Sequence, residues 1–309
     1  MTPLRGGLRV RILMRVIERL PASARGIIAM LLAMAVFACG DALMKASAGH
    51  LPLGEALFLR GIVASVVIWA VAARMGVLRS WPALLSGPLV WRTLGDAGAS
   101  FFYVSALGRI PLADVAAIGQ TGPLAVTACA ALFLGERVGW RRWTATGVGF
   151  LGVLMIIQPG STAFTWASLL VVIAVLSTVG RDIVTRRLAG VPVVLLTLCA
   201  ITFTTLASLA LAPVETWRMP DGGDALRSTA AALALLAGQI LLVVSIRAGD
   251  ISAAVPFRYS HILWSLLLSV VVWNYLPNTL ALTGIVIVCG AGLYTFFREQ
   301  TLRRQGRLA

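Results

Sequence analysis

The sequence predicts an all-α integral membrane protein with ten transmembrane helices, and three observations carry this prediction. The chain of 309 residues is 59% hydrophobic and only 12% charged, with a mean hydropathy of +0.91. An average soluble domain is about half apolar and about one quarter charged. Apolar stretches long enough to cross a hydrocarbon core of about 30 Å recur from Gly26 to Phe297, and basic residues lie mainly between them.

The spans follow one another with little sequence between them. Short connectors rich in turn formers separate most of them, for example Gln158-Pro159-Gly160 and Leu276-Pro277-Asn278. The segment 213–228 is the one expected soluble loop of any size. In chain order the predicted spans are 26–44, 53–73, 88–107, 112–134, 141–157, 164–185, 191–212, 229–247, 252–273 and 278–297.

The distribution of basic residues tests both the number of spans and their orientation. With the N-terminus inside, twenty basic residues, Arg92 and Arg181 among them, fall on the cytoplasmic side. Four fall outside: Lys45, Arg109, Arg218 and Arg227. Because positive loops stay in the cytoplasm, this asymmetry predicts a multi-pass membrane protein with both termini cytoplasmic.

Weak internal repetition suggests two related halves. The segment 105–114 (SALGRIPLAD) resembles 245–254 (SIRAGDISAA), and Thr146-Gly147 parallels Thr283-Gly284. A unit of five helices is odd, so its second copy is inverted in the membrane. We therefore expect a first repeat at 26–160 and a second at 161–298, between a basic cytoplasmic segment, 1–25, and a basic cytoplasmic tail, 299–309.

Ionisable residues inside the predicted spans are candidates for substrate contact, since charge in hydrocarbon is costly and usually faces a cavity or a partner. Asp41 and Lys45 are spaced to pair along one helix face, as are Arg92 and Asp96. Arg60 has no acid on its own face, so it needs Asp41, Asp96 or an anionic ligand. For each of these groups a purely structural ion pair is the alternative.

Predicted span nine carries the richest polar face. Pro256 interrupts helical hydrogen bonding, and Arg258 and His261 share one side, with Tyr259 and Trp264 adjacent. Such a face suits an aromatic or anionic organic solute better than a metal ion, although His261 could equally be a satisfied helix-contact residue. The corresponding part of span four offers Gln120, which is polar but uncharged.

Several other functions find no support in the sequence. The basic residues responsible for the net charge of +14 flank membrane spans, so no nucleic-acid partner is expected. The four cysteines lack metal-site spacing, and neither a metal nor a cofactor is expected. No Walker, HExxH or GxSxG motif occurs, so the chain is predicted not to be an enzyme.

Motifs near the ends of both expected repeats resemble the EamA-domain family of the drug/metabolite transporter superfamily. The first is 134–143 (LGERVGWRRW) followed by 149–153 (GFLGV), and the second includes Pro256-Phe257-Arg258-Tyr259, Pro277 and 292–294 (GLY). The resemblance covers about 26–298 and implies ten helices in two EamA repeats, a location in the bacterial inner membrane and secondary transport of metabolites. Tyr275 stands where the second repeat usually has an acid, so Glu136 is the one remaining acid of that motif, with an anchoring or gating role expected, as for Pro256.

The sequence therefore predicts a secondary transporter of a small organic metabolite working by alternating access. Its substrate-binding candidates are Asp41, Arg60, Asp96, Gln120, Arg258, Tyr259, His261 and Trp264. The span-nine face inclines the expectation toward an aromatic or cofactor-like solute such as riboflavin. Alternatives are an exporter of amino acids, metallophores or drugs, an S-adenosylmethionine transporter, a membrane-embedded lipid enzyme or a non-transporting partner protein. A homodimer, the direction of transport and ion coupling stay open.

Overall fold

A computed structural model describes residues 22–76, 87–133, 139–185, 188, 191–247 and 254–304. These residues form helices and connectors, and no strand occurs among them. Seven helical segments are long and apolar enough to cross a membrane. Large apolar side chains on the outside of the bundle, such as Val66, Phe150, Leu263 and Val286, are more than half exposed. A surface of this kind suits contact with lipid rather than water.

The helices run in the predicted order. They are α2 (Ala22–Ser47), α3 (Leu53–Arg74), α4 (Gly87–Leu107), α5 (Leu112–Gly119), α6 (Gly122–Phe133), α7 (Trp140–Ile157), α8 (Ala167–Thr185), α9 (Val193–Ser208), η3 (Leu209–Leu211), α10 (Gly222–Arg247), η4 (Val255–Tyr259), α12 (Ser260–Trp273) and α13 (Thr279–Arg304). Three predicted spans fall outside the seven apolar ones, namely α4, α7 and the α5–α6 pair. Both α4 and α7 carry charged residues, and α5 and α6 are short.

Two of the predicted helices are not continuous. Span four breaks into α5 and α6 at Gln120-Thr121, because Pro123 lacks a backbone N–H and its ring crowds the carbonyl of Gly119. Span nine begins as the 3-10 segment η4, which contains Pro256, before α12 starts. The predicted loop 213–228 was also too long. Its second part belongs to α10, where the Asp221 carboxylate accepts a hydrogen bond from the Asp224 N–H at 2.6 Å and caps the helix.

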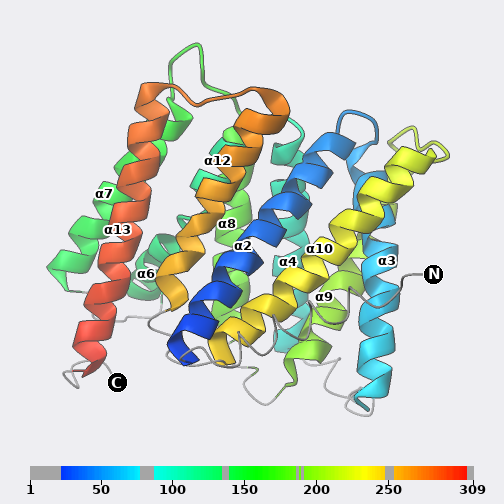
Figure 1. Ribbon diagram of the computed structural model, residues 1–309, viewed down its shortest axis with the longest axis horizontal. Coiled ribbons are helices and arrows are strands. Elements are labelled where there is room, and N and C mark those ends of the chain that lie inside the picture. Colours follow the sequence, from blue (N-terminus) through cyan, green and yellow to red (C-terminus); the bar gives the residue numbers. More distant parts are fainter. Residues whose placement is uncertain are drawn as a thin grey trace, which may run out of the picture.

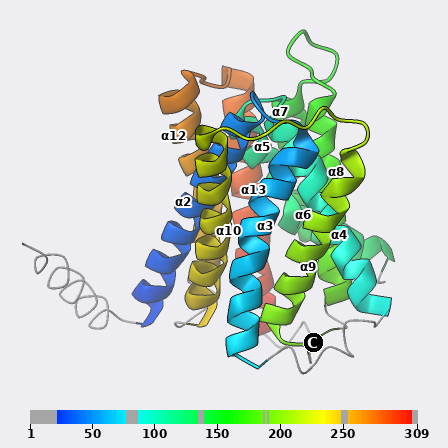
Figure 2. The same cartoon turned by 90° about the vertical axis from the view of Figure 1, so that its right-hand side faces the viewer.

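The connectors gather at two ends of the bundle. Figure 1 shows α2 beginning and α13 ending at the bottom, which we call the lower end. The α2–α3, α4–α5, α7–α8, α9–α10 and α12–α13 connectors lie at the top, called the upper end, and Figure 2 shows the same division from the side. The described parts of the chain thus begin and finish at one end of the bundle, as an even number of crossings requires.

The most extensive helix contacts join the two expected repeats to each other. They pair α2 with α10, α4 with α8, α3 with α9, and α7 with α13. In the two repeats, α2 corresponds to α8 and α4 corresponds to α10, so the α2–α10 contact and the α4–α8 contact are equivalent. The α3–α9 and α7–α13 contacts each join a helix to its own counterpart. This is the pattern of a pseudo-two-fold arrangement, in which the surface between the repeats runs through the middle of the bundle.

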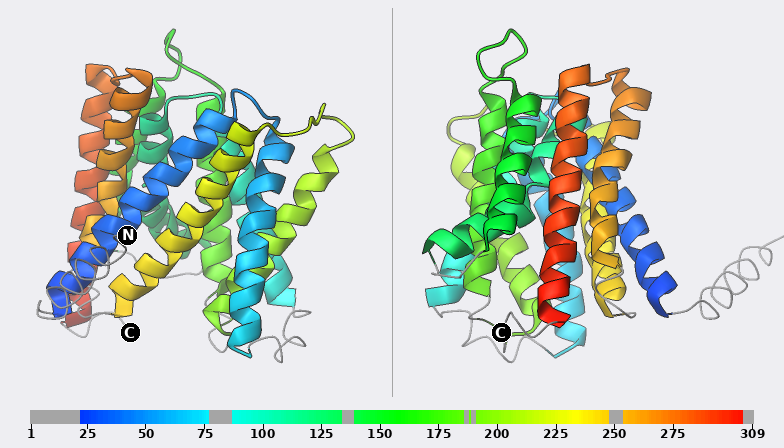
Figure 3. Two further views of the ribbon diagram at one scale, coloured as in Figure 1. Left: turned by 45° about the vertical axis from the view of Figure 1, so that its right-hand side comes forward. Right: turned by 90° about the vertical axis from the view of Figure 1, so that its left-hand side faces the viewer.

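Helices α7 and α13 form one edge of the bundle (Figures 1 and 3). They cross at Gly152 and Gly284, where a Cβ atom on Gly284 would stand only 2.5 Å from the Gly152 carbonyl oxygen. A side chain at either position would push the helices apart, so the close crossing depends on these two glycines.

Candidate functional site

A polar cavity of about 440 Å³ lies inside the bundle. Its wall includes side chains from α2, α3, α4, α8, α9, α10 and η4. Thr185 and Val193, on either side of the α8–α9 connector, place one end of the cavity at the lower end. Six charged side chains line it: Arg60, Arg92, Asp96, Arg181, Asp182 and Arg258.

Two of the four arginines are tied into ion pairs. Asp96 binds Arg92 at 2.7 Å and Arg181 at 2.8 Å, and Arg181 also contacts Asp182 at 2.8 Å. The predicted pair of Arg92 and Asp96 is thus present, with both side chains only 12–13% exposed. Arg92 additionally donates to the Leu196 carbonyl at 3.1 Å, so its head group turns into the bundle.

Arg181 and Asp182 were missed as site residues. Arg181 counted as a cytoplasmic loop charge in the sequence, whereas it lies within α8 and faces the cavity. A signal was available, because both residues fall inside the predicted span 164–185, where a charged side chain marks a candidate site.

Arg60 and Arg258 have no hydrogen bond or ion pair with any residue that the structure describes. Arg60 comes from α3 and Arg258 from η4, so the expected repeats contribute one each. The negative charges of Asp96 and Asp182 offset the positive charges of Arg92 and Arg181. The two remaining arginines give the cavity wall two positive charges in excess. A free guanidinium in such a place is ready to bind a carboxylate or phosphate through two parallel hydrogen bonds.

A second cavity, of about 280 Å³, adjoins the first. The two share Arg60, Ser100 and Leu235 in their walls. Gly119 and Gly122, which flank the break between α5 and α6, also line the second cavity. The interrupted helix therefore faces the polar interior, as irregular backbone in a membrane protein usually does.

Asp41 is the acid of the second cavity. Its Oδ2 atom accepts a hydrogen bond from the Tyr103 hydroxyl at 2.7 Å and lies 3.4 Å from His261 Nε2. His261 is buried, and its Nδ1 atom has no hydrogen-bond partner. The three groups come from α2, α4 and α12, so tertiary packing alone brings them together.

The other predicted site residues lie elsewhere. Tyr259 is buried against Gly292 of α13, and Trp264 is 37% exposed on α12. Gln120 follows α5 at the helix break. These three residues line none of the cavities described here. Pro256 lies in η4, and Glu136 lies outside the described residues.

The upper end is held together by polar contacts. Lys45 does not pair with Asp41 as expected; its ammonium donates to the Leu107 and Ile110 carbonyls at 2.8 and 2.7 Å. The last carbonyls of a helix are natural acceptors for a cation. Tyr275 donates to Asp114 at 3.1 Å.

Further upper contacts cross between the expected repeats. The amides of Gln158 and Asn278 exchange hydrogen bonds at 2.8 and 3.2 Å, and the Gly54 N–H donates to Glu215 at 2.9 Å. At the upper end, the two expected repeats are therefore joined by hydrogen bonds that each contribute a modest free energy.

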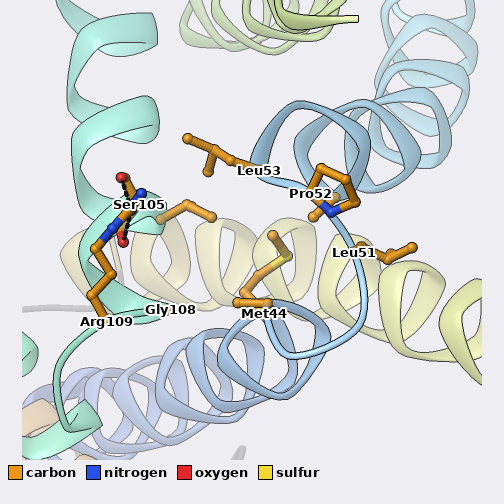
Figure 4. Close-up of a pocket in the computed structure, with 10 residues that line it drawn as sticks. Met44, Leu51, Pro52, Leu53, Ser105, Gly108 and Arg109 are labelled. Atoms are coloured by element: carbon orange, nitrogen blue, oxygen red, sulfur yellow. Dashed lines mark hydrogen bonds between the residues drawn. The ribbon is translucent and has the colours of Figure 1, made fainter. Parts of the chain in front are cut away.

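A small cavity of about 290 Å³ lies among the upper connectors (Figure 4). Met44, Leu51, Pro52 and Leu53 form one side, and Arg109, hydrogen-bonded to Ser105, forms the other. Val104, only 4% exposed, lines both this upper cavity and the cavity around Asp41. Val104 is the residue that the two cavity walls have in common.

A multi-pass helical bundle with a charged interior cavity and contacts that close one end has the architecture of a membrane transporter. Residues 24–158 match the EamA-like transporter family. Together with the relatives described next, this match supports an EamA-type transporter of the drug/metabolite transporter superfamily.

Three relatives extend the similarity beyond the first half. A riboflavin transporter of Rhizobium johnstonii is 28% identical over 204 residues, covering 66% of this chain and 68% of that protein. The pseudopaline exporter CntI of Pseudomonas aeruginosa is 27% identical over 280 residues, covering 85% and 94%. An S-adenosylmethionine uptake transporter of Rickettsia bellii is 25% identical over 283 residues, covering 87% and 92%. A protein of known crystal structure has the same fold, with a TM-score of 0.60 over 91% of this chain and 98% of its own at 21% identity.

Proposed function

We propose that this protein is a secondary carrier that moves a small organic metabolite bearing an anionic group across the bacterial inner membrane by alternating access. The carrying observation is the pair of arginines without described partners, Arg60 and Arg258, in a cavity shared by the two expected repeats. In carriers built from inverted repeats, the substrate site lies near the membrane midplane at the repeat interface.

The depth of Arg60 supports such a site. It lies seven residues after the upper start of α3, which is about 10 Å along a helix. The cavity reaches from there to the lower connectors, while polar contacts join the helices at the upper end. We infer that the lower end, with its many arginines, faces the cytoplasm, that both termini lie there, and that the cavity is the cytoplasm-facing form of the site.

The charge of the wall helps to choose among substrates. S-adenosylmethionine carries a sulfonium cation, which two excess arginines would disfavour. Riboflavin remains a second candidate, since Phe37 places an aromatic ring at the cavity and a riboflavin transporter is among the relatives. Tyr259 and Trp264, on which the aromatic expectation rested, line none of the described cavities, so an anionic group is the better-supported feature.

A catalytic role is not part of this proposal. A lipid enzyme would need Asp41, Asp96 and His261 to converge as acid and base. Asp41 and His261 are adjacent, but Asp96 is bound by Arg92 and Arg181 in a separate cluster. The two-repeat division at residue 160 and a homodimer also stay proposals, the first supported by the pairing of the helices.

The test is exchange of radiolabelled solutes by purified protein in liposomes, with glutamate, succinate, benzoate, riboflavin and S-adenosylmethionine as probes. We expect exchange of at least one carboxylate and a loss of about tenfold or more in Arg60→Gln and Arg258→Gln, because each removes a charge-assisted hydrogen bond. Arg109→Gln, which changes an arginine of the upper connectors, is the matched control. Unchanged exchange in both cavity variants would show that the site is elsewhere.

A further inference from the structure

The acid of the second cavity has the surroundings of a proton-binding site. An ionised carboxylate is the stronger acceptor, so the hydrogen bond from the Tyr103 hydroxyl to Asp41 at 2.7 Å stabilises the ionised form of Asp41. His261 Nε2 lies 3.4 Å from the same oxygen. When the ring proton of His261 is on Nε2, the buried Nδ1 atom carries a lone pair that accepts no hydrogen bond from the described residues. The pair of Asp41 and His261 then has one negative charge and room for one more proton.

The next charge that acts on Asp41 is Arg60. The two residues line the same cavity, and the Asp41 carboxylate interacts electrostatically with the Arg60 guanidinium. Arg60 also belongs to the larger cavity, where the substrate is proposed to bind. One arginine therefore lies between the proton-binding pair and the substrate space.

Among the described residues, the other charged groups on helices packed against α2 belong to other contacts, as Arg92 and Asp96 of α4 belong to the charge cluster of the larger cavity. Lys45, one turn further on α2, is held by carbonyls at the upper end, and Asp114 of α5 binds Tyr275 there. The ionisable residues of α10 lie near its two ends. From α8, Thr178 is the polar residue that lines the cavity around Asp41. Arg258 of η4 faces the larger cavity, where it interacts with Asp182.

We propose that Asp41 and His261 form the proton-binding site of a proton–anion symporter, in which protonation of the pair releases Arg60 to bind the substrate anion. While the pair is negative, it competes with the substrate for the arginine. One proton neutralises the pair, and the substrate anion takes its place beside Arg60. Proton and anion therefore strengthen each other's binding, and linkage makes this effect reciprocal.

The direction of coupling follows from that cooperativity. The carrier crosses between its two forms with both ligands bound or with neither, so proton and anion move the same way. For a monoanion the loaded form carries one added positive and one added negative charge, and transport is electroneutral. This inference rests on the proposed carrier function.

The experiment separates exchange from accumulation in liposomes containing the purified wild-type protein. Radiolabelled glutamate and succinate are the probes, because neither crosses a bilayer unaided, and the first that exchanges is used for the remaining measurements. An inward proton gradient of two pH units should accumulate a monoanionic probe up to about a hundredfold under tight one-to-one coupling, since each pH unit corresponds to a tenfold ratio. Pyranine in the lumen should report acidification with uptake.

In Asp41→Asn, we expect any remaining exchange to lose its dependence on pH and gradient-driven accumulation to fall to the equilibrium ratio. Asp221→Asn is the matched control, because it makes the same substitution at an exposed α10 cap that asparagine can also fill. Tyr103→Phe gives a second readout. It removes a donor that favours the charged carboxylate, so the pH midpoint of uptake should rise.

The outcomes distinguish the two proposals. Absence of exchange for every probe in the wild type overturns the carrier proposal and this inference with it. Exchange without gradient-driven accumulation overturns the symport inference alone. So does a gradient response that survives in Asp41→Asn, and so does a pH midpoint that does not move in Tyr103→Phe when Asp41→Asn fails to fold.

Discussion

The two ends of the bundle differ in how polar groups are used. Toward the lower end, Arg92, Asp96, Arg181 and Asp182 form a connected cluster of charges along the cavity wall. At the upper end, one local cluster holds the buried Asp224 carboxylate between two arginines of the same α9–α10 segment. The upper contacts that join different helices are single hydrogen bonds, from Lys45 to carbonyls, between two amides, and from the Tyr275 hydroxyl to a carboxylate. A charge cluster is costly to break, because breaking it leaves buried charges unpaired. Single hydrogen bonds contribute about 0.5–3 kcal/mol each, so the upper contacts between different helices can open at smaller cost.

The largest expected effect concerns the lower cluster. Asp96→Asn removes the carboxylate that binds two largely buried arginines, so we expect a loss of roughly 3 kcal/mol in stability. The measurement is thermal unfolding of the purified protein in detergent. Asp182→Asn is the comparison, since Asp182 is 48% exposed and contacts one arginine. Equal stability of the two variants would mean that the cluster is not a structural unit.

The next effect concerns Lys45 at the upper end. Lys45→Met keeps the length of the side chain but removes two charge-assisted hydrogen bonds to the end of α4. We expect the population of the form that is open at the upper end to rise about tenfold or more. A cysteine at Val104, in a background without the native cysteines, should then react faster with a membrane-impermeant maleimide. An unchanged labelling rate would place the upper closure elsewhere.

The smallest effect concerns Tyr275. Tyr275→Phe removes one hydrogen bond to Asp114 and should raise labelling at Val104 by only a few-fold. Gln158→Leu tests whether the amide contact at the same end behaves alike. An effect of Tyr275→Phe larger than that of Lys45→Met would reverse the order expected for neutral and charged donors.

The pH dependence of this contact gives a further check on Tyr275→Phe. Burial, and then the nearby Asp114 carboxylate, raises the pKa of Tyr275 from 10.0 to about 12. The phenol therefore stays protonated and able to donate, and its contribution is lost only as pH rises above the ordinary value toward 12. Labelling at Val104 in the Tyr275-containing protein should accordingly show no change from this contact between about pH 7 and 9.

The sequence predicted the helices better than the site. All ten spans have a counterpart, and the Arg92–Asp96 pair followed from helical spacing. Arg181 was assigned to a loop because the count of positive charges uses position along the chain, not depth in the bundle. Lys45 was expected to pair with the local acid, but its ammonium donates to the carbonyls of Leu107, the last residue of α4, and of Ile110 in the connector that follows.

Hydropathy and the placement of arginines by themselves determined that this is a helical membrane protein with about ten crossings, since both are local properties of the chain. Only the tertiary structure decided which polar faces meet. The rotation of each helix about its axis turns Arg60 and Arg258 toward one cavity, turns Tyr259 and Trp264 away from it, and brings Asp41 to Tyr103 and His261. Those rotations depend on packing between distant segments, such as the glycine crossing of α7 and α13, and periodicity within one helix does not contain them.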